Sequence, residues 1–210
     1  MSSPDTPRRR PYRQRARAQA QELTRRRIAE AAVELHGTVG PHRTTIRAIA
    51  DRAGVERVTV YRHFPDERSL FAACSRRFFE DHPQPDLAKP MAITDPVLRT
   101  EAVLLTLYGY YREIEPMMSA LLRDAPVVPA LTEYFGPYVT ILRDLADALS
   151  AAWPGSSSPR IVRAAIGHAL AFPTWQSLAR EQGLTDSEAV GMVLSLLHGL
   201  PTDEGPSAAR

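Results

Sequence analysis

The sequence predicts an all-α protein in which a small N-terminal head of three helices is followed by a larger helical domain, about nine helices in total. Through most of the chain, apolar residues recur at three- and four-residue spacing, which is the period of an amphipathic helix. No segment keeps the alternation of apolar and polar residues that is typical of a strand. Prolines and glycines stand mainly between the periodic segments, where loops are expected.

The chain carries a formal charge of +2, but its charges are unequally distributed. Residues 1–68 hold fifteen Arg and eight acidic residues, whereas residues 69–210 hold eleven basic and sixteen acidic residues. A basic first third followed by an acidic remainder indicates that only the first part faces a polyanion.

The composition also limits the compartment. No run of eighteen apolar residues is present to span a membrane, and the basic N-terminus lacks the apolar stretch of a secretory signal. The single cysteine, Cys74, excludes an internal disulfide framework, and its apolar helical surroundings favour a core position over a nucleophilic one. We therefore expect a cytoplasmic protein.

Residues 1–22 are predicted to be a disordered basic arm, because they are rich in Arg, Pro and Gln and have almost no apolar side chains. Such an arm can add phosphate or minor-groove contacts to a DNA-binding domain. The alternative is a solvated tail that ignores DNA sequence, and the residues leave both open. A second disordered tail is expected over residues 201–210.

Residues 23–68 are predicted to form the head. Its first helix spans about residues 23–36 and ends in a loop that contains Gly and Pro. Thr44 or Thr45 can cap the second helix, because a Thr oxygen accepts a free backbone N–H at a helix start. Gly54 can adopt the left-handed conformation that ends this helix sharply.

The third helix spans about residues 57–64 and ends at Pro65, which has no N–H and restricts the residue before it. Ala50 is followed four residues later by Gly54 and six residues after that by the β-branched Val60. This spacing is typical of a DNA-binding helix-turn-helix. An ordinary helical hairpin with exposed charges is the alternative.

The segment from Thr44 to Phe71 resembles the N-terminal domain of TetR-family transcriptional regulators. The matching positions are Thr45, Ile49, Ala50, Ala53, Gly54, Val55, Thr59, Tyr61, His63, Phe64 and Leu70. The resemblance covers roughly the first third of the chain. It implies a homodimeric DNA-binding regulator whose helical domain usually binds a small inducer. Glu67 departs from the pattern, because the family usually has a Lys there that contacts a phosphate.

The expected DNA contacts lie on the second and third helices. Arg can donate two hydrogen bonds to guanine and Val can touch a thymine methyl group, so four residues are expected at base edges: Arg47, Arg57, Val58 and Arg62. Five are better placed for phosphates, which fix register rather than sequence: Thr44, Thr45, Thr59, Tyr61 and His63. For Arg52 an ordinary solvated position is the stronger expectation.

Residues 69–200 are predicted to form a helical effector-binding and dimerisation domain. Asp66 can cap a linking helix over residues 67–81. The further expected segments are a helix from residue 96 interrupted at Pro116, one from about 131 to 149 kinked at Pro137, and one each over 161–181 and 186–198.

The last two helices are expected to form the homodimer interface. In the resembled family, these helices form a four-helix bundle with their mates from a second subunit. A dimer is also favoured because a short recognition helix contacts few base pairs, so that specificity normally needs two half-sites. The alternative is that both helices only close the core of the monomer.

Helices interrupted by proline can leave a cavity, and the helical domain is rich in aromatic and soft side chains. The expected effector contacts are Tyr108, Tyr111, Arg112, Met117, Phe135, Tyr138, His168, Phe172 and Trp175. Ordinary core packing is the alternative for each aromatic residue. If a ligand binds, we expect it to be largely apolar or aromatic.

The sequence contains no Gly-rich phosphate loop, no GxSxG, no HExxH and no Cys pair, so neither catalytic residues nor a metal or cofactor is expected. An enzyme would need His168, Glu113 and Tyr111 in one pocket and would leave the helix-turn-helix unexplained. We expect a ligand-responsive regulator, a repressor that binds a palindromic operator as a homodimer. A DNA-binding regulator controlled by a protein partner is the alternative.

Overall fold

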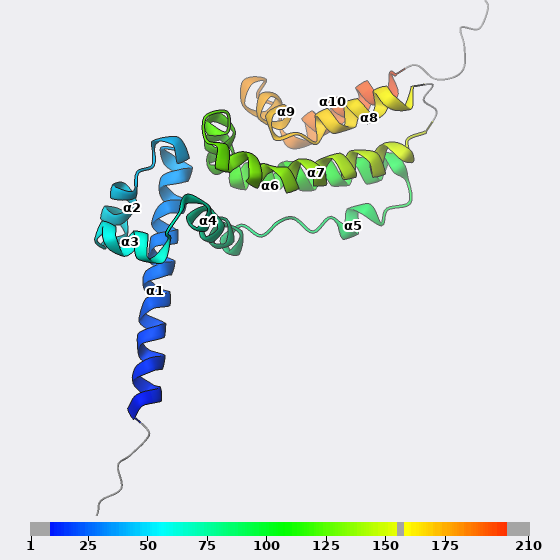
Figure 1. Cartoon of the computed structure of the whole chain (residues 1–210). Helices are drawn as coiled ribbons and strands as arrows, with labels where there is room; N and C mark the ends of the chain where they lie inside the picture. Colours follow the sequence, from blue (N-terminus) through cyan, green and yellow to red (C-terminus); the bar gives the residue numbers. More distant parts are fainter. Residues whose placement is uncertain (1–8, 155–157, 201–210) are drawn as a thin grey trace, which may run out of the picture. The chain divides into compact units, whose positions relative to one another are not determined.

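The computed structural model describes residues 9–154 and 158–200 (Figure 1). Over these residues the chain forms ten α-helices and two short helical turns and contains no strand, which confirms the all-α prediction. The chain divides into two compact units. The head unit comprises the chain up to His82 together with Ser119–Ala130, and the helical unit comprises Pro83–Met118 and the chain from Leu131 onward. Among the described helices, none is long and apolar enough to cross a membrane.

The head unit begins with α1 (Arg9–Thr38), a helix of 30 residues. This helix starts fourteen residues before the predicted start at Leu23, so that residues 9–22, expected as a disordered arm, are helical. Arg, Gln and Ala, which dominate this stretch, all have high helix propensity and outweigh its lack of apolar residues. The predicted segments 1–8 and 201–210 lie outside the described residues.

The rest of the head follows the prediction closely. After the 3₁₀ turn η1 (Pro41–Arg43) come α2 (Ile46–Ala53), α3 (Arg57–His63) and α4 (Glu67–Asp81). Their buried faces surround Ile28 of α1 and form one core, which consists of Ile28, Ala29, Ala31, Ala32, Ile49, Ala50, Ala53, Val60, Phe64, Leu70, Ala73 and Cys74. Burial raises the pKa of the Cys74 thiol to about 12, as a core position requires.

Three local signals that set the head's turns are confirmed. The Thr45 hydroxyl accepts the Ala48 N–H at 3.1 Å and caps α2. Gly54 adopts the left-handed conformation, with φ 62° and ψ 44°, and so ends α2 before α3 begins. The Asp66 carboxylate accepts the Ser69 N–H at 2.7 Å and caps α4.

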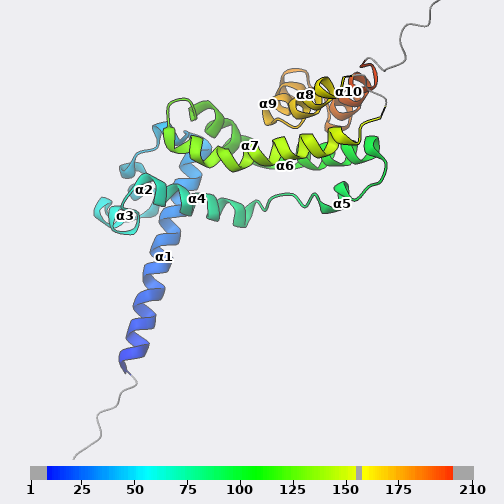
Figure 2. The ribbon, with the colours of Figure 1, turned by 45° about the vertical axis from the view of Figure 1, so that its right-hand side comes forward.

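The helical unit contains a short α5 (Ala88–Met91), most of α6 (Pro96–Asp124) and nearly all of α7 (Pro129–Ala151). In both views α6 and α7 run alongside each other (Figures 1 and 2). The predicted interruption at Pro116 was wrong, because α6 continues through it. Ile114 and Met118 are buried on either side of Pro116 and hold the helix together, although the proline removes one backbone hydrogen bond.

The unit ends with α8 (Pro159–Ala169), α9 (Phe172–Gln176), the π-helical turn η2 (Ser177–Glu181) and α10 (Asp186–His198). The single helix predicted over residues 161–181 was therefore wrong. Pro173 cannot donate a backbone hydrogen bond, and the chain becomes extended at Ala171, with φ −75° and ψ 135°. The helix over 186–198 agrees with the prediction.

The division into units differs from the expected boundary between residues 68 and 69. The helix α4 packs into the core of the head through Leu70, Ala73 and Cys74. The last turn of α6 also belongs to the head unit. Sequence periodicity could not show this, because it identifies which face of a helix is buried but not which core receives it.

Candidate DNA-binding surface and effector region

The outer faces of α2 and α3 carry the predicted base-contacting residues. On α3, Val60 is fully buried whereas Val58 is 64% exposed. An exposed Val on a short helix is free to contact a partner rather than the core. Arg57 and Arg62 are exposed on the same helix, and Arg47 is exposed on α2 with only a long ion pair of 3.7 Å to Asp51. All four predicted residues therefore lie open to solvent.

The residues predicted to contact phosphates differ in their exposure and in their hydrogen bonds. Tyr61 is 49% exposed, and the oxygen of the Thr45 cap leaves its hydroxyl proton available. The Thr44 hydroxyl instead donates to the Gly40 carbonyl at 2.7 Å, so a phosphate would have to replace that bond. Thr59 and His63 are both half-buried. Burial and the nearby Arg62 and Arg25 lower the pKa of His63, so its imidazole favours the neutral form.

Two arginines of α1 hold α2 and α3 in place, and sequence reasoning did not identify them. Arg25 donates from Nη1 to the His63 carbonyl at 2.6 Å, and its guanidinium lies 4.3 Å from the centre of the Phe64 ring. Arg27 donates from Nη2 to the Ala53 carbonyl at 2.7 Å. Both place a positive charge at a helix C-terminus, where the carbonyls lack helical partners. No local spacing predicts contacts between residues this far apart in the chain.

The neighbouring surface of α2 is also tied to α1. Arg52 Nε donates to Glu34 Oε2 at 2.8 Å, so Arg52 is paired within the head. This pairing agrees with the expectation that Arg52 is not a base contact.

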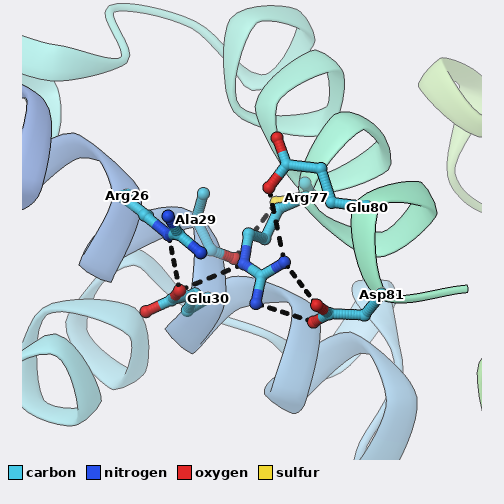
Figure 3. A network of polar contacts seen from close by, with 7 residues as sticks. Arg26, Ala29, Glu30, Arg77, Glu80 and Asp81 are labelled. Atoms are coloured by element: carbon cyan, nitrogen blue, oxygen red, sulfur yellow. Dashed lines mark hydrogen bonds and ion pairs between the residues drawn. The ribbon is translucent and has the colours of Figure 1, made fainter.

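An ionic network fixes α4 against α1 (Figure 3). Arg77 of α4 pairs with Glu30 of α1 at 3.0 Å and with Asp81 at 2.7 Å, and only 16% of its side chain is exposed. Arg26 pairs with the same Glu30 at 3.0 Å. A groove of about 250 Å³ opens beside this network, between α1 and α4, and Leu23 lines part of it. The network leaves α4 little freedom to move relative to α1.

The last turn of α6 holds the loop that leads into α2. The Asp124 carboxylate accepts the His42 N–H at 3.0 Å, and Arg123 donates from Nη2 to the Val39 carbonyl at 3.1 Å. Gly40 has φ 92°, and a Cβ there would lie 2.4 Å from Asp124 Oδ2. The hydrogen bond from Arg123 is the largest cause that lowers the pKa of Asp124, which therefore stays ionised. The end of α6 thus binds the chain three residues before the Thr45 cap.

Five of the predicted effector residues form an aromatic cluster in the helical unit, and four of the five are buried. The rings of Tyr111 and Phe172 lie 5.4 Å apart, and those of Tyr111 and Trp175 lie 6.1 Å apart. Tyr108 stacks on Tyr111, and the Tyr111 and Tyr138 hydroxyls lie 3.0 Å apart. The Tyr108, Tyr111, Phe172 and Trp175 side chains are at most 1% exposed.

Two tyrosines of the cluster also stabilise the break between α8 and α9. Tyr108 and Tyr111 donate their hydroxyls to the carbonyls of Ala169 and Leu170, at 2.9 Å and 2.6 Å. These carbonyls lie where α8 ends and would otherwise lack partners. Burial raises the pKa of both tyrosines, that of Tyr108 to about 12, so both hydroxyls keep their protons as donors.

The other predicted effector residues lie around the cluster or away from it. Phe135 packs against Tyr138 with ring centres 6.2 Å apart. Arg112 pairs at 2.6 Å with Asp186, which also accepts the Trp175 indole N–H at 3.1 Å. Met117 is half-buried, and His168 is exposed. His168 and Glu113 are exposed, whereas Tyr111, the third residue of the enzyme alternative, is buried.

Comparison with known proteins agrees with this architecture. The sequence model of the bacterial regulatory proteins of the tetR family matches residues 28–74, which span the core of α1 through α4. No curated protein sequence matches the chain.

Several solved structures share the fold. NalD of Pseudomonas aeruginosa, described as the secondary repressor of the MexAB-OprM multidrug efflux pump, is 25% identical; the match covers 89% of this chain and 100% of NalD, with a TM-score of 0.58. A TetR-like transcriptional regulator from Rhodococcus sp. RHA1 is 20% identical over 83% of this chain and 93% of its own, with a TM-score of 0.61. The multidrug binding protein EbrR is 22% identical over 86% of this chain and 98% of its own, with a TM-score of 0.54.

The helix-turn-helix head and the all-helical unit that follows it have the fold of a TetR-family transcriptional regulator. The family model matches residues 28–74, and this match confirms the predicted resemblance.

Proposed function

We propose that the protein is a homodimeric repressor that binds a palindromic operator in the cytoplasm and is released by a small, largely apolar or aromatic effector. The observation that carries the DNA-binding part is the exposed face of α3, with Val58 and Tyr61 open to solvent while Val60 is buried. Arg25 and Arg27 hold this face rigidly by hydrogen bonds to the ends of α3 and α2. Because these hydrogen bonds already fix the position of α3, the helix can enter the major groove with little loss of conformational entropy.

The roles of two residues can be separated on a selected operator. Selection of sites from random duplex DNA at physiological salt should yield a two-fold symmetric motif. Arg57→Gln should relax the preference at one base pair per half-site, because a bidentate contact to guanine contributes about 1–3 kcal/mol of discrimination. Tyr61→Ala should weaken binding to all sequences alike, because a phosphate contact carries no sequence information. An unchanged preference in Arg57→Gln would contradict its role at a base edge.

The exposed faces of the last helices support the dimer. On α10, Val190, Val193 and Leu197 are buried on one side, yet Met192 is 38% and Leu196 63% exposed on the other. Gly191 lies beside Met192, and an added Cβ there would meet no atom within 4 Å. A helix that is apolar on both sides needs a second partner, and a symmetric copy of the same surface satisfies it.

The aromatic cluster supports the effector. A ligand that entered beside the break between α8 and α9 would replace ring contacts of Tyr111 and Tyr138 and would compete with their hydroxyl bonds. NalD and EbrR, which share the fold, are described by their links to multidrug efflux and multidrug binding. The proposal is tested by screening aromatic cations and apolar aromatic compounds. The first readout is quenching of Trp175 fluorescence in a Trp153→Phe background, and the second is release of the operator. Quenching without release would show a ligand that does not regulate DNA binding.

The dense packing of the same cluster favours a second candidate function. With Tyr108, Tyr111 and Trp175 buried and hydrogen-bonded, the cluster resembles an ordinary core, as expected for a regulator controlled by a protein partner. Failure of every compound in the screen, together with operator binding that a cell extract abolishes, would support this second candidate.

A further inference from the structure

The first half of α1 extends away from the core of the head. We call residues 9–23 the α1 arm. Every residue from Gln14 to Leu23 is exposed, and Ile28 is the first buried residue in the part of α1 from Gln14 onward. In both views the arm continues beyond α2 and α3 (Figures 1 and 2). At 1.5 Å per residue, its fifteen residues span about 22 Å.

The helix propensity of Arg, Gln and Ala favours a helical arm, but little else stabilises this helix in water. It has no apolar stripe that could pack on the head, and isolated helices of this length are marginal. Residues 8–17 contain six Arg and no acidic residue. Arg stands at positions 9, 13 and 17, and like charges four residues apart destabilise a helix by about 0.2–0.5 kcal/mol per pair. Positive charges at a helix N-terminus also oppose the helix dipole.

A polyanion would remove each of these penalties. Phosphates alongside the arm would neutralise the Arg repeat and favour the N-terminal end of the helix. Duplex DNA presents one phosphate charge per about 1.7 Å of its axis, so an arm of this length can face several phosphates. The arm is also placed next to DNA-contacting residues, because Arg25, two residues beyond its end, donates to the carbonyl of His63 at the end of α3.

We propose that the α1 arm lies as a helix along the phosphates that flank each half-site, outside the bases that α3 contacts. This inference rests on the proposed operator binding. It deepens that function, because it gives the arm a defined binding partner and a defined conformation. The arm then adds affinity without adding sequence preference, and it lengthens the DNA that each subunit covers.

The test compares two duplexes, the selected operator alone and the same operator with about ten base pairs added at each end. The full-length protein should bind the flanked duplex about tenfold more tightly at physiological salt. Arg13→Gln/Arg15→Gln/Arg17→Gln should abolish this advantage and reduce the slope of log K against log salt by about 0.9 for each phosphate that the arm no longer neutralises.

Two further variants separate charge from conformation. Ala16→Pro/Ala18→Pro keeps every charge but breaks the helix, and it should lose most of the flank advantage. Gln14→Ala/Gln19→Ala keeps both charge and helix, and it should behave like the unmodified protein.

The outcomes distinguish this inference from the proposed function. Equal binding to the two duplexes by the unmodified protein would overturn the inference but leave operator recognition intact. A full flank advantage in the proline variant would also overturn it, since the contacts would then come from a disordered arm. Absence of specific binding to the operator alone would overturn both the inference and the proposed function.

Discussion

The hydroxyl of Tyr111 offers the sharpest test of the helical unit. Tyr111 is 1% exposed and donates to the Leu170 carbonyl at 2.6 Å. Tyr111→Phe keeps the ring and its packing but leaves that buried carbonyl without its donor at the end of α8. An unsatisfied buried group of this kind costs about 1–3 kcal/mol, so we expect the free energy of unfolding to fall by about 2 kcal/mol.

The assay uses the position of the two tryptophans. Trp153 and Trp175 are the only tryptophans in the chain, and both belong to the helical unit. Their fluorescence in a urea titration therefore reports that unit, while operator affinity reports the head. Tyr111→Phe should shift the fluorescence transition and leave the affinity unchanged. Val139→Ala, at a residue of the same unit that is 58% exposed, is the control and should leave the transition unchanged. A loss below about 0.5 kcal/mol in Tyr111→Phe would refute the account of the break between α8 and α9.

Three other predictions concern the head and the dimer. Gly40→Ala should lower the melting temperature in circular dichroism, because φ 92° suits only Gly and the added Cβ meets the end of α6. Gly199→Ala, where the nearest atoms lie at 3.6 Å, should not, and equal shifts in both would contradict the strain at residue 40. Burial lowers the pKa of His36 from 6.5 to about 4, so the unfolded chain binds more protons between these values. Stability should therefore fall by up to about 3 kcal/mol as the pH drops through this window, and His36→Leu should remove that dependence in pH-resolved melts. Leu196→Glu should weaken the dimer at least about 100-fold in sedimentation equilibrium, since each subunit contributes one copy of this apolar side chain. Leu98→Glu, at a residue 54% exposed on α6, should leave the dimer intact, and an equal effect would place the interface elsewhere.

The sequence was most informative where local chemistry decides the structure. Thr45, Gly54 and Asp66 each act within a few residues of their own position, and each has the predicted conformation or hydrogen bond. The two prolines Pro116 and Pro173 show the limit of this approach. Both prolines remove a backbone donor, but buried neighbours carry α6 through the first, whereas hydroxyls from α6 stabilise the break before the second. The local sequence allows either a continuous helix or a break at each proline, and tertiary contacts determine which of the two forms.

The candidate sites show the same limit. Exposure of Arg57, Val58 and Tyr61 could be expected from the helical period, because the buried Val60 fixes the orientation of α3. The hydrogen bonds of Arg25 and Arg27 could not be predicted from the sequence, because their partners are backbone carbonyls of other helices. The sequence of α1 does not distinguish these two arginines from its other basic residues. The aromatic residues were correctly expected in the helical unit, but composition could not show that their hydroxyls bind one another and the end of α8.

An effector that binds the helical unit, as proposed above, would have to act on the head through the segments of chain that connect the two units. The chain crosses after α4, within α6 at Met118, and near the start of α7. The α6 crossing is a continuous helix, which transmits a displacement along its axis with little loss. Its last residue, Asp124, holds the His42 N–H, three residues before the cap of α2. Because α4 is fixed to α1 by Arg77, we expect a shift of α6 to act first on the loop before Thr45. A ligand can produce that shift only by the difference in its affinity for the two positions of α6.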